Sequence, residues 1–296
     1  MKIVIAGASG LIGTPLVQHL RNTGHEVVVL VRRPPRSAHE VQWNPKSGEL
    51  DPAAISGADA VIGLSGAGVG DKRWTAAYKK EILDSRTTAI GTLAKAIAAA
   101  EVKPHVFIAG SAIGFYGERG QEVVTEASPR GTGFLSDVVV AWEAAAQPAR
   151  DAGVRTVHIR TGLVVSGKGG ALAKMIPLFK LGLGGTLGGG KQRWSMISLT
   201  DEIRAIEFLV THDVHGPVNL TAPDMPSNAQ VTSALARVLR RPAILPVPAF
   251  ALKLVLGEFS VEITGSAAVK PEVLQNAGFE WQHPTIESAL RAELSR

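Results

Sequence analysis

Cysteine is absent from the 296 residues. Disulfides, thiolate nucleophiles and zinc or iron–sulfur sites held by cysteine are therefore excluded. Long apolar runs are missing too, because no stretch approaches the roughly 20 residues that a membrane helix needs. The opening MKIVIAG leads directly into a strand and lacks the zones of a signal peptide. These absences predict a cytoplasmic protein without a membrane partner.

Charge of one sign is not concentrated anywhere. The net charge is +5, but the basic residues are scattered, with only short pairs such as Arg32-Arg33 and Arg240-Arg241. No aromatic residues are interleaved with them to stack against bases. Because nucleic-acid binding normally requires a basic stripe, the sequence predicts no nucleic-acid partner.

Several common catalytic patterns are incomplete. The stretch from Gly185 to Gln192 is close to a phosphate-binding loop for nucleoside triphosphates, but Gln192 replaces the hydroxyl residue that binds magnesium. His212 and His215 have no third ligand nearby, and no G-x-S-x-G motif is present. We therefore predict no metal site and no covalent hydrolase.

What the sequence does contain is an alternation of apolar runs and helical segments. Apolar runs typical of strands buried on both faces of a parallel sheet occupy residues 2–6, 26–31, 58–64, 106–109, 156–160 and 218–220. Helical spacing is present at about 11–24, 75–100, 134–152 and 201–210, and from Thr285 onward. The alternation predicts an α/β fold, a doubly wound parallel Rossmann sheet with a smaller C-terminal α/β substrate lobe.

The composition of the sequence changes after Gly162. Residues 182–190 are dense in glycine, and proline becomes frequent from Pro223. We predict a nucleotide-binding domain over residues 1–162, with its sheet completed by about 191–222, and a smaller lobe from residues 163–190 and 223–296. Residues 264–284 either form part of a homodimer face or cover the cleft, and the sequence does not choose between these alternatives.

A glycine motif follows the first predicted strand. Its glycines permit a tight turn, a close backbone approach to a pyrophosphate, and close packing of the next helix on the sheet. The anion then lies at the helix N-terminus, where free N–H groups favour negative charge. The predicted cofactor-binding residues here are Gly7, Ser9, Gly10, Leu11, Ile12 and Gly13.

The end of the second predicted strand indicates which nucleotide binds. NAD sites place Asp or Glu there for the ribose hydroxyls, whereas this chain has Arg32 and Arg33. A guanidinium fork suits a phosphate, so the predicted cofactor is NADP(H), the alternative being that both arginines merely solvate the strand end. We also expect Asp59 to position the adenine side, and the cofactor to contact the loop Leu64, Ser65, Gly66 and Ala67, and Arg86 of the following helix.

Several sequence blocks together resemble a known family. They are the glycine motif, LSGAGVGDKRW at 64–74, SAIGFYG at 111–117, RTGLVVSGKGGALAKMIPLFKLGLGG at 160–185 and FALKLVLGE at 250–258. In this order, over nearly the whole chain, they resemble the atypical extended short-chain dehydrogenases that are labelled "epimerase family protein". The resemblance implies a Rossmann fold with a family-specific C-terminal domain, but it implies no defined substrate.

The wider superfamily uses a Ser or Thr that holds the substrate oxygen, a Tyr that transfers the proton, and a Lys four residues after the Tyr. Ser111 matches the first role. No Tyr-x-x-x-Lys occurs, and the helix where it is expected reads FLSDVVVAWE at 134–143. Tyr116 is the best remaining proton donor, although it can equally be a wall of the pocket.

Three further residues are candidates for substrate contact. Arg160 ends a predicted strand and can bind an acidic or carbonyl group, or form a structural ion pair. Arg193 and Trp194 follow the glycine-rich loop, and Trp194 is also suited to packing between the lobes.

Two functions compete for this sequence. One is an NADP(H)-dependent oxidoreductase or epimerase that acts on a small-molecule substrate through Ser111 and Tyr116. The other is a non-catalytic protein in which NADPH occupancy gates binding or regulation. The missing Tyr-x-x-x-Lys favours the second, whereas the glycine motif together with a whole substrate lobe favours the first.

Overall fold

The computed structural model describes residues 1–294. Its centre is a seven-stranded sheet in the order β10-β7-β5-β4-β1-β2-β3, with every neighbouring pair parallel. The strands are β1 (Lys2–Ala6), β2 (Glu26–Val31), β3 (Glu40–Gln42), β4 (Ala60–Gly63), β5 (Val106–Ala112), β7 (Arg155–Thr161) and β10 (Gly216–Leu220). The strand order reverses between β1 and β4, which is where open parallel sheets bind ligands. The doubly wound Rossmann sheet predicted from the sequence is confirmed.

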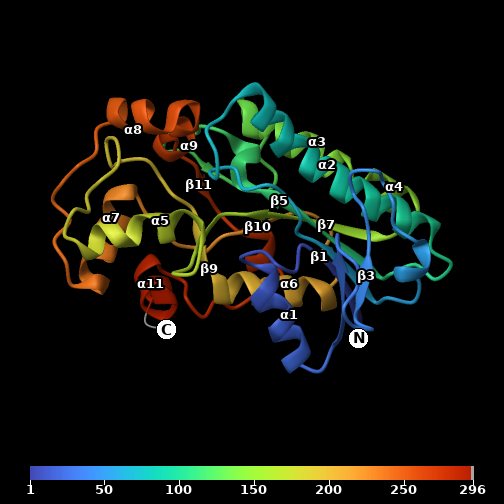
Figure 1. The fold of residues 1–296 in the computed structure, drawn as a ribbon. Helices are drawn as coiled ribbons and strands as arrows, with labels where there is room; N and C mark the ends of the chain where they lie inside the picture. The colour runs from blue at the N-terminus through green and yellow to red at the C-terminus, as the bar shows by residue number, and fades with distance from the viewer. Residues whose placement is uncertain (295–296) are drawn as a thin grey trace.

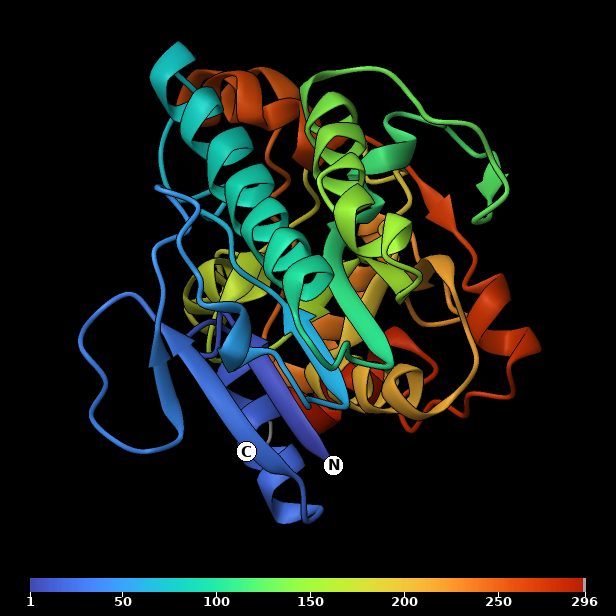
Figure 2. The same ribbon diagram turned by 90° about the vertical axis from the view of Figure 1, so that its right-hand side faces the viewer.

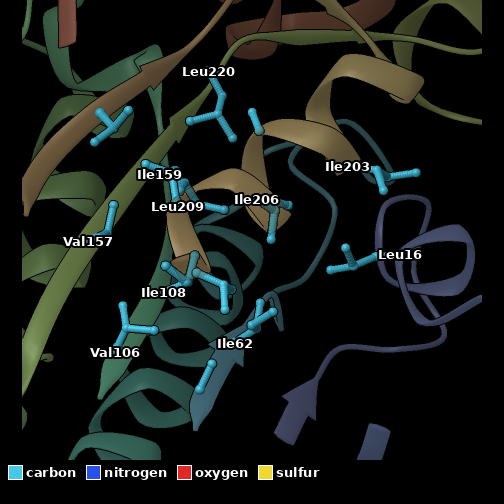
Figure 3. Close-up of a cluster of buried hydrophobic side chains, with 14 of the residues drawn as sticks. Leu16, Ile62, Val106, Ile108, Val157, Ile159, Ile203, Ile206, Leu209 and Leu220 are labelled. Atoms are coloured by element: carbon cyan, nitrogen blue, oxygen red, sulfur yellow. The ribbon is translucent and has the colours of Figure 1, made fainter. Parts of the chain in front are cut away.

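Helices cover both faces of this sheet (Figures 1 and 2). One face carries α1 (Gly13–Asn22) and α6 (Leu199–Thr211), and the other carries α2 (Ala76–Ala99), α3 (Phe134–Ala144) and α4 (Gln147–Asp151). Side chains along β5 alternate between these layers: Val106 and Ile108 join the α1/α6 cluster, whereas Phe107 and Ala109 join the other. Figure 3 shows the α1/α6 cluster, in which aliphatic side chains from helix and sheet meet.

Most of the remaining elements lie beyond the carboxyl edge of the sheet (Figure 1). Two small parallel sheets pair β8 (Leu163–Val165) with β9 (Met196–Ser198) and β6 (Val123–Val124) with β11 (Ala268–Val269). The helices are α5 (Gly170–Lys180), α7 (Asn228–Leu239), α8 (Ala249–Leu256), α9 (Ser260–Thr264), α10 (Glu272–Asn276) and α11 (Ile286–Leu294). Short 3-10 turns are η1 (Pro52–Ala54), η2 (Ile113–Tyr116) and η3 (Gly257–Phe259). The division into a 1–162 domain and a split lobe stays a proposal.

Three local expectations were wrong. The helix expected over 134–152 is broken into α3 and α4, because Pro148 has no N–H to donate to the carbonyl of Ala144. The strand expected to end at Ala109 continues to Ala112, so Ser111 lies inside it. Asp59 precedes β4 on the opposite edge from the glycine motif, and its Oδ2 accepts a hydrogen bond from the backbone N of Lys2 at 2.7 Å. It therefore cannot position a nucleotide at the carboxyl edge.

Within residues 1–294, no helix is both long enough and apolar enough to cross a membrane.

One carboxylic acid lies inside the apolar α1/α6 layer. Glu202, on the first turn of α6, is 0% exposed. Its Oε1 accepts a hydrogen bond from Thr161 Oγ1 at 2.8 Å, while Oε2 has no partner among the described residues. Because burial disfavours the charged form, the pKa of Glu202 is raised to about 8. The folded protein therefore holds this side chain mainly in its neutral form at neutral pH.

Glu202→Gln is expected to make the stability of the protein less sensitive to pH. In the unfolded chain Glu202 ionises above its ordinary pKa of 4.5, so the stability it contributes is present below that pH and is lost as the pH rises to about 8. The variant should therefore gain roughly 2–4 kcal/mol relative to the wild type between about pH 5 and pH 8. Urea denaturation at several pH values measures this, with the exposed Glu280→Gln as control. A wild-type-to-variant difference that stays constant with pH would contradict the account.

Candidate functional site

Two loops meet at the carboxyl edge where the strand order reverses. The glycine motif follows β1, and the loop that begins at Leu64 follows β4. Gly7 has φ +88°, and a Cβ there would lie 2.7 Å from the carbonyl carbon of Leu64 and 2.9 Å from the nitrogen of Ser65. Only glycine accommodates both the positive φ and this approach. The two backbones are therefore in direct contact, and the loops share one surface.

The start of α1 is open towards this surface. A Cβ on Gly13 would lie 2.2 Å from the carbonyl oxygen of Gly7, so glycine lets the helix begin directly above the strand. Among residues 1–294 no side chain caps the N-terminus of α1, and the first turn of α1 has no acidic residue. Ser9 and Gly10 are exposed in front of it. An anion can therefore approach the N-terminal N–H groups and the positive end of the helix dipole.

The two arginines after β2 have different environments. Arg33 forms a bidentate pair with Glu40, at 2.8 Å for Nη1–Oε2 and 2.7 Å for Nη2–Oε1. Its pKa is raised and that of Glu40 is lowered to about 2, both mainly through this hydrogen bonding. Arg32 is exposed, and it forms no ion pair with any residue from 1 to 294. Arg32 is therefore available to an external phosphate, whereas Arg33 is held at the start of the loop to β3.

A second arginine lies behind the loop after β4. The Arg86 guanidinium lies 5.0 Å from the centre of the Trp142 ring, and its Nη1 donates to the carbonyl of Ile82 at 3.0 Å. A Cβ on Gly66 would lie 3.2 to 3.4 Å from the Arg86 side chain. In the described chain Arg86 has no ion pair, and burial lowers its pKa to about 10. This half-buried cation is held between the indole and the loop.

Ser111 belongs to a buried polar network beneath α3. It is 4% exposed, and its Oγ donates to Glu143 Oε1 at 2.6 Å. Arg160 binds both oxygens of Glu143, through Nε at 2.8 Å and Nη2 at 2.9 Å. Burial opposes ionisation of Glu143, but the hydrogen bonds from Arg160 and Ser111 outweigh it and hold the pKa below its ordinary value. Arg160 is thus engaged in an internal ion pair.

Tyr116 extends the network to the far strand of the sheet. Its side chain is 0% exposed, and its hydroxyl donates to Asn219 Oδ1 at 2.7 Å and accepts from Arg160 Nη1 at 3.1 Å. Burial raises the pKa of Tyr116. Asn219 Nδ2 in turn donates to the carbonyl of Lys270 at 3.0 Å. The network therefore connects β5, α3, β7 and β10 with the segment near β11.

The helix that would carry Tyr-x-x-x-Lys is apolar where those side chains are expected. Phe134 of α3 meets Trp74 edge to face, with ring centroids 5.0 Å apart, and Trp74 also meets Phe259 at 5.5 Å. Leu135 and Val138 belong to the same cluster. This cluster fixes the loop after β4 between α3 and the C-terminal lobe. Its Tyr78 hydroxyl donates to the carbonyl of Gly68 in that loop.

The remaining sequence candidates lie at the junction with the C-terminal lobe. Arg193 donates from Nη1 to the carbonyl of Met225 and from Nε to Gln121 Oε1, both at 3.0 Å. Trp194 is buried and its Nε1 donates to the carbonyl of Ile263 at 3.3 Å. Both side chains thus have partners within the protein, and a substrate contact for either stays a prediction.

Sequence reasoning missed several residues of this region. Glu143 and Asn219 complete the buried network, and the acid that directly follows the apolar residues 138–142 of α3 was the available signal for Glu143. Lys174 of α5 was also missed, although its Nζ donates to the carbonyl of Gly70 at 2.7 Å. A Cβ on Gly169, just before α5, would lie 3.0 Å from Leu11 Cδ1. The start of α5 therefore lies against both the glycine motif and the loop after β4.

Comparison with known proteins assigns this architecture to a family. Residues 3–221 match the model of the "NAD dependent epimerase/dehydratase family", and residues 247–293 match a domain of unknown function, DUF1731. An epimerase family protein of Mycobacterium bovis is 44% identical over 97% of this chain and 96% of its own length. A chloroplastic SDR39U1 homolog of Arabidopsis thaliana is 35% identical over 99% of this chain and 86% of its own length. Cytoplasmic localisation stays a prediction.

Two solved structures extend the comparison. The human epimerase family protein SDR39U1, crystallised with NADPH, superimposes with a TM-score of 0.93 at 29% identity and covers 100% of both chains. A nucleoside-diphosphate sugar epimerase of Corynebacterium glutamicum gives a TM-score of 0.81 at 33% identity over 99% of this chain and 58% of its own. With its glycine loop at the switch point of a seven-stranded parallel sheet and its DUF1731 segment, the chain belongs to the NAD-dependent epimerase/dehydratase family, as an epimerase family protein of the extended short-chain dehydrogenase kind.

Proposed function

We propose that this chain binds NADP(H) across the carboxyl edge of its sheet and acts as an NADP(H)-dependent oxidoreductase or epimerase on a small carbonyl, hydroxyl or sugar-like substrate. The observation that carries the proposal is Arg32, which follows β2, is exposed and forms no ion pair within residues 1–294. The parallel register of β1 and β2 brings it close to the start of α1, which no described side chain caps. NADPH in the crystal structure of human SDR39U1 supports the choice of cofactor.

The residues at this edge fit each charged part of the dinucleotide. The N-terminus of α1 offers N–H groups to the pyrophosphate, and Gly7, Gly10 and Gly13 leave room for the backbone to approach it. Arg32 offers a fork of donors to the 2′-phosphate. Arg86, a desolvated cation that has no ion pair in the described part of the chain, supplies positive charge behind Gly66. These N–H and guanidinium groups match the negatively charged phosphates of a phosphorylated dinucleotide.

A bound nicotinamide would supply the hydride, so the protein must orient the substrate and deliver a proton. The sequence favours Ser111 as the group that holds the substrate oxygen and Tyr116 as the proton donor. Both hydroxyls are buried and hydrogen-bonded to protein groups. Their arrangement supports a positioning role, in which the network fixes η2 and the end of β5, more directly than contact with the substrate.

This engagement of both hydroxyls favours a second candidate function. In a non-catalytic protein, NADPH would order the loop after β4, and through the Trp74 and Phe259 contact it would also order the C-terminal lobe. Such a protein needs the cofactor site but no proton donor, which agrees with the apolar face of α3. The test that separates the two functions is consumption of NADPH.

Arg32→Gln is expected to weaken NADPH binding at least about tenfold while changing NADH binding little, because the 2′-phosphate is the group that distinguishes the two. Arg33→Gln is the matched control: it removes the neighbouring guanidinium, which is already paired with Glu40. We expect a smaller change in the NADPH-to-NADH ratio from this variant. Titration of each variant with NADPH and with NADH, followed by the fluorescence of the reduced nicotinamide, measures the two affinities. If the two variants lose NADPH affinity equally, or if Arg32→Gln weakens NADPH and NADH binding equally, the assignment of Arg32 is wrong.

Ser111→Ala should separate the two functions in a screen of small aldehydes, ketones and sugar nucleotides that follows NADPH oxidation. If the chain is an enzyme, the variant should lower kcat at least about tenfold and leave the dissociation constant of NADPH unchanged. Ser136→Ala is the matched control, since Ser136 is also buried but its hydroxyl lies 3.0 Å from the backbone carbonyl oxygens of Phe115 and Gly131 instead of a carboxylate. Equal effects of the two variants on kcat would show that Ser111 has only a structural role. If the wild-type protein binds NADPH but does not oxidise it with any substrate of the screen, the result would favour the non-catalytic function.

A further inference from the structure

The C-terminal lobe exposes a group of large apolar side chains. Nine of the 12 that residues 1–294 expose lie between residues 178 and 261. We call them the α8 surface: Leu178, Leu181, Leu183, Ile244, Leu245, Phe250, Leu254, Val255 and Val261. Exposed apolar residues scattered singly are ordinary, but a group of this size marks an interaction site.

These residues come from segments that lie side by side. The chain after α5 runs along the loop before α8, with Leu245 N donating to the carbonyl of Gly184 at 3.1 Å and Val247 N donating to that of Thr186 at 2.8 Å. That loop leads directly into α8, whose eight residues include one buried side chain, Leu252. In both views α8 lies at the edge of the molecule (Figures 1 and 2).

The side chains of the α8 surface protrude. Ile244 and Leu254 are each 77% exposed, and Phe250 is 76% exposed. A partner helix docks its apolar face into a groove, which protruding side chains do not form. A groove of about 580 Å³ does exist between α7 and α11, but polar and charged side chains such as Gln230, Arg237 and Glu287 line it. The shape of the α8 surface therefore fits insertion into a soft apolar medium.

Exposed cations accompany the apolar side chains. They are Arg73, Lys180, Arg240, Arg241 and Lys253, and none of them forms an ion pair with another described residue. Lys180 and Lys253 alternate with the apolar residues of α5 and α8. Arg73 lies at the end of α8, where a Cβ on Gly257 would be 3.0 Å from its Nε. In η3 and α9 the acids are Glu258, which pairs with Lys79, and Glu262. The surface is therefore basic overall.

This charge argues against a second copy of the chain as the occupant. A twofold interface places the same surface patch on both subunits, so the unpaired cations of one copy would meet those of the other. Like charges brought together in this way oppose association. An anionic partner has no such penalty.

We propose that the α8 surface docks on a lipid bilayer that contains anionic lipids. The apolar side chains of α8 are buried at the boundary between the headgroups and the acyl chains, and the cations contact the lipid phosphates. Peripheral docking requires no spanning segment. It departs from the sequence-based expectation of no membrane partner, which rested on the absence of a long apolar run. The proposal is independent of cofactor binding.

Sedimentation with sucrose-loaded vesicles tests the proposal on the full chain. We expect binding to vesicles of phosphatidylcholine with about one third phosphatidylglycerol, and at least about tenfold weaker binding to phosphatidylcholine alone or at high salt. The double variant Phe250→Ser, Leu254→Ser should reduce binding to the anionic vesicles at least about tenfold. Arg240→Gln with Arg241→Gln should reduce it by roughly the same factor and weaken its salt dependence.

Matched controls are available elsewhere on the surface. Val102→Ser removes another exposed apolar side chain, and Lys95→Gln removes an exposed cation of α2. Both should leave vesicle binding unchanged, and all variants should keep the wild-type circular dichroism melting curve. Failure of the wild type to bind the anionic vesicles, or undiminished binding by the Phe250, Leu254 variant, would overturn the proposal. So would sedimentation velocity that shows a wild-type dimer and a monomeric Phe250, Leu254 variant, because the α8 surface would then be a subunit interface.

Discussion

The backbone of Gly7 passes so close to Leu64 and Ser65 that no side chain fits between them, and the rest of the site depends on this contact. It holds the ends of β1 and β4 together at the point where the strand order reverses. The same close packing lets α1 begin directly above β1, since Gly13 lies on the carbonyl of Gly7. The loop after β4 then lies against Arg86 behind it and the start of α5 in front. A binding surface for an elongated anionic ligand is built from backbone, with few side chains.

A second constraint explains why the usual catalytic helix looks so different here. In this chain α3 uses Glu143 to hold Arg160 and Ser111, and it uses its apolar residues to bind the loop after β4 to the C-terminal lobe. Breaking a buried ion pair by removing one partner typically costs about 3–5 kcal/mol, so the helix is fixed by its structural contacts. The chemistry, where it occurs, must therefore use a proton source other than α3. The chain thus lacks the Tyr-x-x-x-Lys pair of the wider superfamily that its sequence resembles, but it keeps the glycine loop at the point where the strand order reverses.

Local features of the fold were predictable from the sequence, and long-range ones were not. Buried parallel strands are continuous apolar runs, and a glycine turn between strand and helix has its own spacing, so both are visible in a short window. The strand β3 is three residues long and mostly polar, which leaves no such signal. Tyr116 finds its partner Asn219 across 103 residues, so its burial was not deducible from neighbours. The pairing of Arg33 with Glu40 is an intermediate case, since the acid stands seven residues later, and only the turn to β3 brings them together.

The central claim is that this edge of the sheet recognises a dinucleotide carrying a 2′-phosphate. Calorimetric titration of the purified protein, stripped of bound nucleotide, with NADPH and then with NADH at the same salt concentration tests it most directly. The account predicts one site per chain and clearly tighter binding of NADPH. Equal affinity for both would contradict the role of Arg32, and binding of neither would leave the Rossmann fold as a scaffold with no cofactor.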